Sequence, residues 1–590
     1  MRRLLSPAAI LLALICLLSL YLQLAAARRD SVTLDETIHI YAGYSYLTKH
    51  DFRLDPEHPP LLKEIGAVPL LFMHLNPPGD KSWNDAAPYY EDHWHEARLL
   101  GEQFLYSVGN DHNRIVFWSR LPFILLTLVL GIFAWFWANK LYGWKAGLLA
   151  AFLVLLLPTL LAHGHLDNTD LVVLFIFVGV YFWGKFLQFR RARDLLPAAL
   201  FAGCAFASKY TAGLLLPILL ILALGRLYLC EKSARLWRPY LAGFLALLVI
   251  GFLVTWASYQ FGTRVPPPAP SANPTWGGSV PPSAVRPLLL HARWLFLPAE
   301  FYKGLFMIFH HALAGHLSFL LGETSRSGWW YYFPVAILFK TPLPAFLFLG
   351  LAIVFHAKLR PRSGDDFDEF LLLAPALTFL VLSMFSKADL GVRHVLPIFP
   401  FLLVYAAKSI NLLDLRGGSV PRRDGEGREE QPEQPRRARQ PGKRGLLPAA
   451  GFAALIVWYL ACALPPLTPQ FNYIAYFNEL AGGPSGGYRL LSDSNIDWGQ
   501  DLNRLREYLR AHRISVVSVE CPPEGDPSYA GYGIGATPLE PGVPWQRYAV
   551  VGTTLLNRPE LSWLRYYPAV QITPGLFLID LRQPRPVADP

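Results

Sequence analysis

The stretch PAAILLALICLLSLYLQLAAARRDSVTLDE, residues 7–36, decides the fold class of this chain. Positions 7–27 carry no charge, and about 20 such residues let an α-helix cross the hydrocarbon core of a bilayer. Ala25, Ala26 and Ala27 would also suit a cleavable signal peptide. Because the apolar run is longer than a usual signal core, we expect a retained membrane-spanning helix over about residues 4–26.

The composition of the whole chain indicates the same class. Of its 590 residues 53% are hydrophobic and 16% are charged, whereas roughly 25% are charged in a soluble domain. Uncharged runs recur at 121–139, 146–162, 171–184 and 239–263. We therefore predict a polytopic α-helical membrane protein. Its net charge of +10 then belongs in cytoplasmic loops and does not indicate a nucleic-acid partner.

Basic residues orient the expected spans. Basic clusters flank the apolar stretch 193–226 on both sides, which predicts a short hairpin with Lys209 at its outer tip. The total is about eleven spans, with the N-terminus cytoplasmic and the C-terminal part outside. Besides the hairpin they cover residues 4–26, 115–138, 146–162, 171–188, 239–259, 332–356, 368–385, 395–410 and 446–464.

Two domains are expected. Residues 1–465 form the transmembrane domain, whose long connections are two outer loops and a cytoplasmic loop of disordered composition: 27–113, 261–330 and 416–445. Residues 466–590 form a small extracytoplasmic α/β domain, with a helix over 500–511 and strands over 514–519, 548–553 and 576–581. The five cysteines show no spacing typical of a disulfide framework or a metal site.

On this topology the unusual ionisable side chains fall in outer loops or at the outer ends of spans. They are Asp35, Glu36, His58, His163, His165, Asp167, Asp170, Lys209, Arg393 and His394. Ionisable groups at such depths are costly and are usually functional. Acids on two loops and bases on others predict an enclosed site of mixed charge.

The sequence also limits the chemistry of such a site. It contains neither a P-loop of the form GxxxxGK[ST] nor a G-x-G-x-x-G after a predicted strand. An activated substrate would therefore arrive through the membrane, for example as a group carried on a lipid phosphate. Its transfer needs a carboxylate to take the acceptor proton and cations to stabilise the departing phosphate. Asp35 suits the first role, and Lys209 and Arg393 suit the second.

Structural alternatives exist for these residues. Asp35 and Glu36 could cap a helix, and Lys209 could extend its amine from a helix end toward the headgroups. Arg393 and His394 could form an ordinary interfacial pair.

Metal binding is a further option. His163 and His165 could contact headgroups, or could bind a divalent metal ion together with Asp167 or Asp170. The stretch that begins at residue 493 is similar to the start of a calcium loop, but tryptophan occupies the place of the required glycine. We therefore expect Asp497 to act mainly as a helix N-cap. No cofactor is firmly implied.

Several short motifs follow one another in a fixed order. They are Asp35-Glu36, His58-Pro59-Pro60-Leu61, His163-Gly164, Thr169-Asp170, Ser208-Lys209-Tyr210, Gly328 to Pro334, Lys340-Thr341-Pro342, Gly391 to Pro397 and Asp493 to Leu502. In this order they resemble the GT-C type membrane glycosyltransferases that use polyprenyl-phosphate sugars, the group of protein O-mannosyltransferases and lipid A aminoarabinose transferases. The resemblance covers residues 1 to about 510.

The resemblance implies an inverting glycosyltransferase of the cell (inner or plasma) membrane. It would move a hexose or pentose from a polyprenyl-phosphate carrier to a hydroxyl of an acceptor glycan, lipid or protein on the outer face. A transporter or lipid flippase is the alternative, but it predicts an internal repeat and acids near mid-membrane, and the sequence shows neither. A non-catalytic scaffold is disfavoured by the one-sided charge cluster.

The resemblance also implies roles for single residues. Asp35 would be the catalytic base or acceptor-orienting acid, supported by Glu36. Lys209 and Arg393 would face the lipid phosphate. The aminoarabinose transferases have a lysine where this chain has His58, so the donor contact there differs. The remaining candidates are His394 for the donor and, in support, His163, Asp167 and Asp170.

Overall fold

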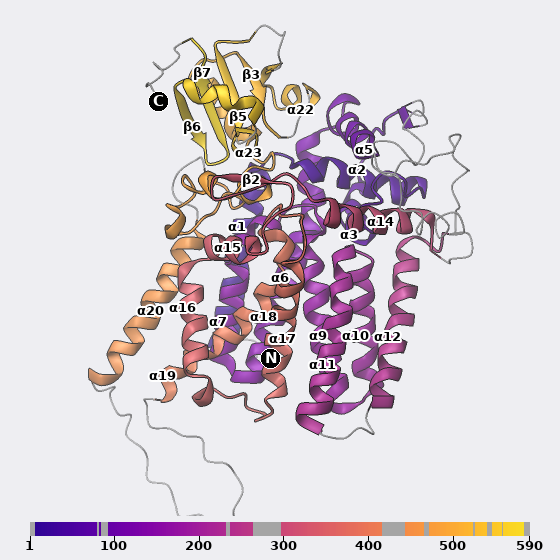
Figure 1. Ribbon diagram of the computed structural model, residues 1–590, viewed down its shortest axis with the longest axis vertical. Coiled ribbons are helices and arrows are strands. Elements are labelled where there is room, and N and C mark those ends of the chain that lie inside the picture. Colours follow the sequence, from indigo (N-terminus) through magenta and orange to yellow (C-terminus); the bar gives the residue numbers. More distant parts are fainter. Residues whose placement is uncertain are drawn as a thin grey trace, which may run out of the picture.

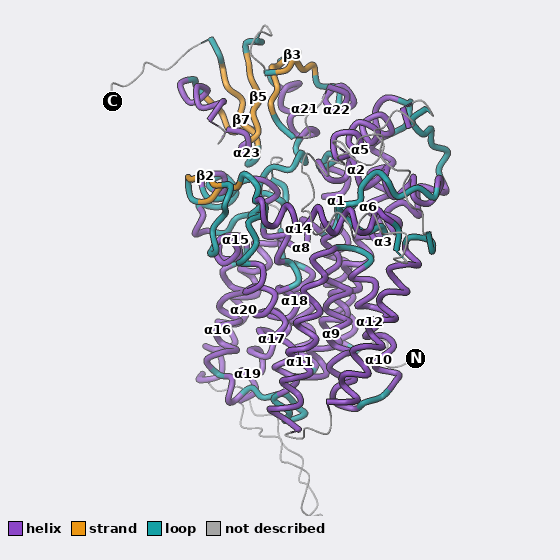
Figure 2. The backbone as a smooth tube through the Cα atoms, turned by 45° about the vertical axis from the view of Figure 1, so that its right-hand side comes forward, coloured by secondary structure: helices purple, strands orange, loops and turns teal. Residues whose placement is uncertain are grey.

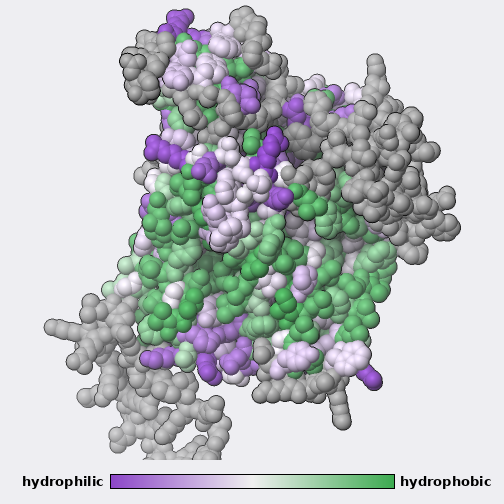
Figure 3. All heavy atoms as spheres, viewed as in Figure 1, coloured by the Kyte–Doolittle hydropathy of each residue, from purple (hydrophilic) through white to green (hydrophobic). Residues whose placement is uncertain are grey.

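The computed structural model is a tall helical bundle with a small sheet domain at one end (Figure 1). It describes residues 6–79, 82–83, 93–231, 237–262, 297–415, 443–464, 471–522, 526–539, 545–556 and 559–582. Strands gather at the end that carries the C-terminal domain, and the rest is helix and loop (Figure 2). On the face seen in Figure 3, hydrophobic side chains form a band across the bundle between more polar ends, as expected for a membrane-spanning body.

Helices of the first half pack side by side. They are α1 (Pro7–Arg29), α6 (His112–Tyr142), α7 (Trp144–Leu155), α8 (Pro158–His163), α9 (Val172–Phe189), α10 (Ala192–Phe206), α11 (Leu215–Gly225) and α12 (Trp237–Ser258). The hairpin predicted over 193–226 is present as α10 and α11, with Lys209 between them at the end nearer the sheet domain. The predicted span 146–162 is instead two helices, because Pro158 begins α8 and cannot continue α7.

The second half adds α14 (Ala299–Ala314), α15 (Tyr332–Lys340), α16 (Leu343–Val354), α17 (Phe367–Ser383), α18 (Ile398–Ala407), α19 (Leu412–Leu415) and α20 (Lys443–Ala463). The span predicted over 332–356 consists of two helices, α15 and α16, with a bend of 108° between them. Pro342, the N-cap of α16, has no N–H to continue α15. Within the described ranges, five helices are long and apolar enough to cross a membrane, or six if the bent pair counts as one span. The total of about eleven spans stays a prediction.

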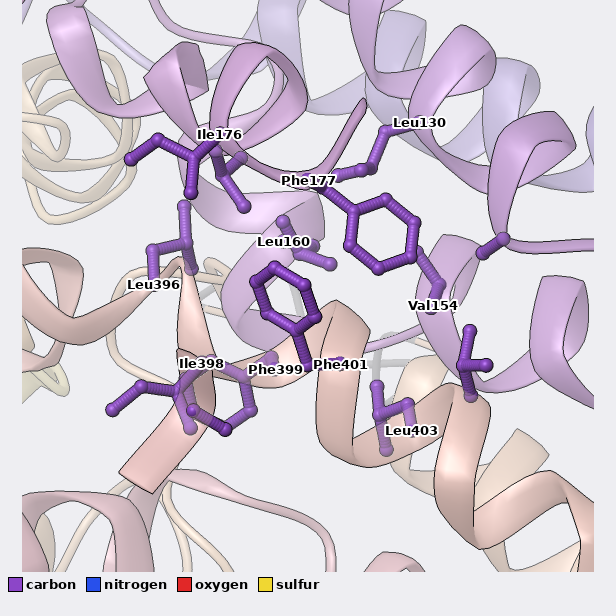
Figure 4. Packing of buried hydrophobic residues seen from close by; sticks show 14 of the residues in the cluster. Leu130, Val154, Leu160, Ile176, Phe177, Leu396, Ile398, Phe399, Phe401 and Leu403 are labelled. Atoms are coloured by element: carbon purple, nitrogen blue, oxygen red, sulfur yellow. The ribbon is translucent and has the colours of Figure 1, made fainter. Parts of the chain in front are cut away.

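One apolar core joins the two halves. Figure 4 shows Phe177 of α9 and Phe401 of α18 meeting, with Leu130, Val154 and Leu160 around them. The two phenyl rings lie 4.9 Å apart at 74°, a favourable edge-to-face contact. Between helices in lipid such close packing, rather than exclusion of water, supplies most of the attraction.

Three shorter helices lie at the sheet-domain end of the bundle. They are α2 (Leu34–Lys49), α3 (Leu61–Ala67) and α5 (His93–Glu102). Short turns of 3₁₀-helix place the site residues there, among them η3 (Thr169–Leu171), η4 (Tyr210–Leu214) and η9 (Val392–Val395). The Pro-rich stretch at 265–268 and the predicted loop 416–445, as far as residue 442, lie outside the described residues.

The C-terminal domain contains a mixed five-stranded sheet of order β4-β3-β5-β7-β6. Its strands are β3 (Val516–Glu520), β4 (Gly535–Pro538), β5 (Tyr548–Gly552), β6 (Ala569–Thr573) and β7 (Leu576–Asp580). β3 is parallel to β4 and β5, whereas β7 is antiparallel to both of its neighbours. The predicted strands correspond to β3, β5 and β7, and the sequence analysis did not predict β4 or β6.

The helix predicted over 500–511 is α21 (Leu502–Ala511). Its N-cap is Asp501, so the prediction that Asp497 caps this helix is wrong. Short helices α22 (Asp526–Gly531) and α23 (Thr553–Leu556) and a hairpin of β1 (Ser318–Leu320) and β2 (Glu323–Ser325) complete the described elements used here.

Candidate active site

Glu36 fixes the start of α2. It forms a capping box with Thr33, in which the carboxylate accepts the Thr33 N–H at 2.9 Å. The same carboxylate pairs with Arg120 of α6 at 2.6 Å, with both side chains fully buried. It also accepts the backbone N–H of Asp167 at 2.9 Å. Although burial alone would raise it, the pKa of Glu36 is lowered because of Arg120 and these hydrogen bonds. Glu36 therefore joins α2, α6 and the loop before α9.

Asp35, next in the chain to Glu36, faces a different partner. Its Oδ2 lies 2.8 Å from Nη1 of Arg393, which stands on η9. The Asp35 side chain is 19% exposed and that of Arg393 11%, so the pair is reachable from outside. The Nε atom of Arg393 has no hydrogen-bond partner in the described structure. A guanidinium carries five N–H donors, so this one keeps capacity for a second oxygen-rich group.

A second ion pair lies beside the first. Nζ of Lys209 lies 2.7 Å from Oδ1 of Asp170, and Nδ1 of His163 lies 3.2 Å from Oδ2. Arg393 attracts both Asp35 and Asp170 electrostatically, so the two pairs form one cluster. We call Asp35, Arg393, Asp170 and Lys209 the outer cluster. Its members come from α2, η9, η3 and the α10–η4 connection, far apart in sequence.

Two predicted histidines border this cluster. His58 lies in the loop before α3, where its ring packs 5.6 Å from that of His39 and its Nδ1 has no partner among the described residues. Burial lowers the pKa of His58 well below its usual range, despite the attraction of Asp55. His394 follows Arg393 on η9, and its buried Nε2 likewise finds no partner in the described chain. Both imidazoles are therefore neutral groups at the edge of the outer cluster.

Asp167 and His165 point elsewhere. The Asp167 carboxylate is fully buried against Gly66, where an added Cβ would come within 2.4 Å of it. Burial and Glu36 raise the pKa of Asp167 well above its usual range. His165 instead pairs with Asp30 at 3.0 Å. His163 and His165 thus serve different carboxylates, and the described residues present no group of three His, Cys, Asp or Glu side chains gathered for a metal ion. Metal dependence stays untested.

Sequence analysis missed three contributors. Arg120, the partner of Glu36, was hidden inside the predicted span 115–138, although a charge within an apolar run is itself a signal. Lys63, which bonds Asp55 at 2.9 Å and the His58 carbonyl at 2.7 Å, lies on a short helix with no distinctive pattern. Trp498 lies over the Arg393 guanidinium, 4.0 Å from ring centroid to Cζ. Only the folded chain brings it there.

The first half of the bundle matches a known family. Residues 109–256 fit the family model described as dolichyl-phosphate-mannose-protein mannosyltransferase, and this segment holds His163, Asp167, Asp170 and Lys209. The resemblance to GT-C type membrane glycosyltransferases is confirmed. No curated protein matches the chain.

Three solved structures are similar to this chain over different shares of its length. ArnT from Cupriavidus metallidurans bound to undecaprenyl phosphate is 14% identical, with 96% of this chain and 97% of that one covered and a TM-score of 0.47. Archaeoglobus fulgidus AglB, in complex with an inhibitory peptide and a dolichol-phosphate, is 12% identical, with coverages of 98% and 75% and a TM-score of 0.47. The S. cerevisiae Pmt1-Pmt2 complex bound to the sugar donor is 17% identical, with coverages of 43% and 33% and a TM-score of 0.32. At these TM-scores we draw no functional conclusion from them.

Proposed function

We propose that this chain is an inverting glycosyltransferase that moves a sugar from a polyprenyl-phosphate carrier to an acceptor hydroxyl. The observation that carries the proposal is the outer cluster, in which two acids and two bases from four separate segments meet. The matched family, whose name contains a dolichyl-phosphate sugar, supports this class of donor. A transporter receives no support from that match.

Asp35 is the proposed base. The acceptor hydroxyl gives its proton to the Asp35 carboxylate while its oxygen forms a bond to the anomeric carbon of the donor sugar. The bond between that carbon and the phosphate oxygen breaks on the opposite face, which inverts the configuration. The phosphate leaves with the electron pair and remains on the polyprenyl chain.

Arg393 and Lys209 are the proposed phosphate contacts. Fixed cations near the leaving oxygen stabilise the charge that develops there, and a guanidinium suits a phosphate because it can donate two parallel hydrogen bonds. The free Nε of Arg393 supports this role within the described structure. Because Arg393 and Lys209 pair with Asp35 and Asp170 at 2.8 and 2.7 Å, an arriving phosphate competes with both carboxylates. Donor binding would then release Asp35 for the acceptor.

The neighbouring residues are proposed to hold this arrangement. Glu36 fixes the start of α2 through Arg120, and so positions Asp35. His163 orients the Asp170 carboxylate. His58 and His394, with unpaired ring nitrogens inside the described structure, are proposed to meet polar atoms of the donor. Asp167 supports the loop before α9 through its backbone bond to Glu36.

The setting of the reaction is also a proposal. The site lies at the end of the bundle that carries the C-terminal domain, which we place on the extracytoplasmic side of the cell membrane, with the N-terminus in the cytoplasm. The acceptor is a glycan, lipid or protein, and the sugar is a hexose or pentose. We derive no step through a divalent metal ion, and comparing transfer with and without a chelator tests metal dependence.

Mass spectrometry of lipid that co-purifies with the protein tests the proposal. A bound polyprenyl phosphate or polyprenyl-phosphate sugar is the expected result, and it would also identify the sugar. Transfer from that lipid to extracted membrane acceptors should follow. Binding of neither a polyprenyl phosphate nor its glycosylated form, when these lipids are added to purified protein, would overturn the proposed function.

A further inference from the structure

The segment from Leu491 to Leu502 connects both sides of the outer cluster. On one side the backbone N–H of Leu34, directly before Asp35, donates to the Trp498 carbonyl at 3.0 Å. On the other side the backbone N–H of Val392, directly before Arg393, donates to Oδ1 of Asn495 at 3.0 Å. This segment lies in the C-terminal domain before β3 and therefore ties that domain to both members of the Asp35–Arg393 pair.

Trp498 is the residue of this segment whose side chain contacts the Asp35–Arg393 pair. It is 3% exposed, and its ring faces the Arg393 guanidinium at 4.0 Å, well inside the ~6 Å range of a cation–π contact. The His163 ring lies 6.0 Å from it on the other wall of the site. A buried tryptophan more often serves only to fill a core. Trp137, which is 1% exposed and packs on Phe177 and Tyr181, is such a case.

The need for such a contact follows from the bonding of Arg393. Its one hydrogen bond to a described side chain is that from Nη1 to Asp35, and Nε has no partner there. A guanidinium held by one bond at one corner can still rotate about it. A flat aromatic face fixes the plane of the guanidinium without occupying any of its N–H donors.

We infer that Trp498 is a positioning residue that holds the Arg393 guanidinium in the plane that receives the donor phosphate. The inference rests on the proposed function and deepens it, because it gives the C-terminal domain a part in donor binding. Stacking leaves the edge of the guanidinium free, so phosphate oxygens can bind while Trp498 stays in place.

The test compares Trp498→Leu with Trp498→Phe. Leucine keeps an apolar side chain but has no π face, and phenylalanine keeps a face. We expect Trp498→Leu to raise the KM for the polyprenyl-phosphate sugar about tenfold and to weaken binding of polyprenyl phosphate alone by the same factor. Trp498→Phe should restore most of both, and the KM for the acceptor should not change.

A matched control exists earlier in the C-terminal domain. Phe477 lies under Nζ of Lys340 at 4.4 Å, a cation–π contact to a lysine that is not a member of the outer cluster. Phe477→Leu should leave the donor KM unchanged even if it lowers Tm. Should the leucine variant of Trp498 fail to fold, Trp498→Met replaces it, and the order Trp, Phe, Met in donor affinity is then the expected result.

The possible failures are distinguishable. If a folded Trp498→Leu binds polyprenyl phosphate as the unsubstituted protein does, or if Trp498→Phe is no better than Trp498→Leu, the inference is wrong. If Arg393→Ala also leaves binding unchanged, the proposed phosphate contact of Arg393 is wrong as well, whereas the proposed function fails only if the unsubstituted protein binds neither lipid. If Arg393→Ala abolishes binding and Trp498→Leu does not alter it, only the role of Trp498 is refuted.

Discussion

Buried charges join separate helices at both ends of the bundle, but they are bonded differently. At the end away from the C-terminal domain, Glu369 of α17 accepts from Lys408 at 2.7 Å and from the Tyr142 hydroxyl at 3.0 Å, and it pairs with His356 at 2.9 Å. We call these four residues the inner cluster. No buried polar side-chain atom of the inner cluster lacks a partner in the part of the chain that the structure describes.

The outer cluster contains the same kinds of group but leaves some of them incomplete. Within the described structure Nε of Arg393 and, beside it, Nε2 of His394 have no hydrogen-bond partner. A buried polar atom without a partner costs free energy, and a bound ligand or water is one way to offset that cost. The comparison therefore supports the proposal that the outer cluster binds a ligand, whereas the bonding of the inner cluster suits a role in stability.

Substitution of the proposed base should have the largest effect. Asp35→Asn keeps the size of the side chain and a contact to Arg393 but cannot accept the acceptor proton, so transfer should fall about 10²–10⁴-fold. Tm should change little, because Asp35 is 19% exposed. Transfer from a defined polyprenyl-phosphate sugar, alongside thermal unfolding in detergent, measures both. Retained transfer would remove Asp35 from the mechanism.

Substitution in the inner cluster should have the reverse effect: it should lower stability and leave transfer unchanged. Lys408→Met leaves Glu369 buried without its main counter-ion, which should lower the free energy of unfolding by about 3–5 kcal/mol. Because Lys408 is fully buried and belongs to the inner cluster, kcat per folded molecule should not change. Adding Glu369→Gln to the variant should recover much of the stability. Loss of transfer in a folded Lys408→Met protein would contradict the division between the two ends.

Most helices of the bundle can be predicted from hydropathy and charge along the sequence, but the breaks between helices cannot. Charge-free runs locate α1, α6, α9 and α12, and flanking arginines identify the hairpin at Lys209. The 108° bend between α15 and α16 depends on how α16 packs, which hydropathy does not contain. β4 contains glycine, alanine and proline and a single β-branched residue, Thr537, so its sequence alone does not predict a strand, and it is recognised only by its pairing with β3.

The candidate site, too, could be predicted from the sequence only in part. The sequence predicted which acids and bases share an end of the bundle, but not which of them pair. Asp35 and Glu36 are neighbours in sequence, yet one meets Arg393 and the other Arg120. Successive helical residues point about 100° apart, so their partners come from different segments, and these are fixed only by tertiary packing. His163, at the end of α8, and His165, in the turn that follows, likewise serve different carboxylates.

Substituting one lysine at each end of the bundle tests the comparison further, and the expected effect on donor KM is of intermediate size. Lys209→Gln removes a charged donor from the proposed phosphate site, and a hydrogen bond to a charged group contributes about 1.5–3 kcal/mol. The donor KM should therefore rise about 10–100-fold. Lys185→Gln is the control, since Lys185 lies 3.6 Å from Asp368 at the opposite end of the bundle. Equal effects of the two substitutions on donor KM would show that Lys209 has only a structural role.

The smallest expected effect is on how protein stability depends on pH, and it arises in the loop that leads to Arg393. Asp389 is 2% exposed and accepts the Trp329 N–H at 2.7 Å, while Gly328 adopts φ +68° beside it. Burial raises the pKa of Asp389 from 3.8 to about 6. Between these two values the native state binds more protons than the unfolded state, so the free energy of unfolding falls as pH rises through this window.

Asp389→Asn keeps an acceptor for the Trp329 N–H but does not ionise, so it should remove this loss of stability. The Tm of the variant minus that of the unsubstituted protein should be smallest near pH 4 and should increase through pH 6, where Asp389 is half ionised in the native state. From about pH 7 the difference should stay constant, because Asp389 is then almost fully ionised. Thermal unfolding of both proteins from pH 4 to 8 measures it. A difference that does not depend on pH would mean that Asp389 is already ionised at pH 4, and that the outer end tolerates its buried carboxylate as the inner end tolerates Glu369.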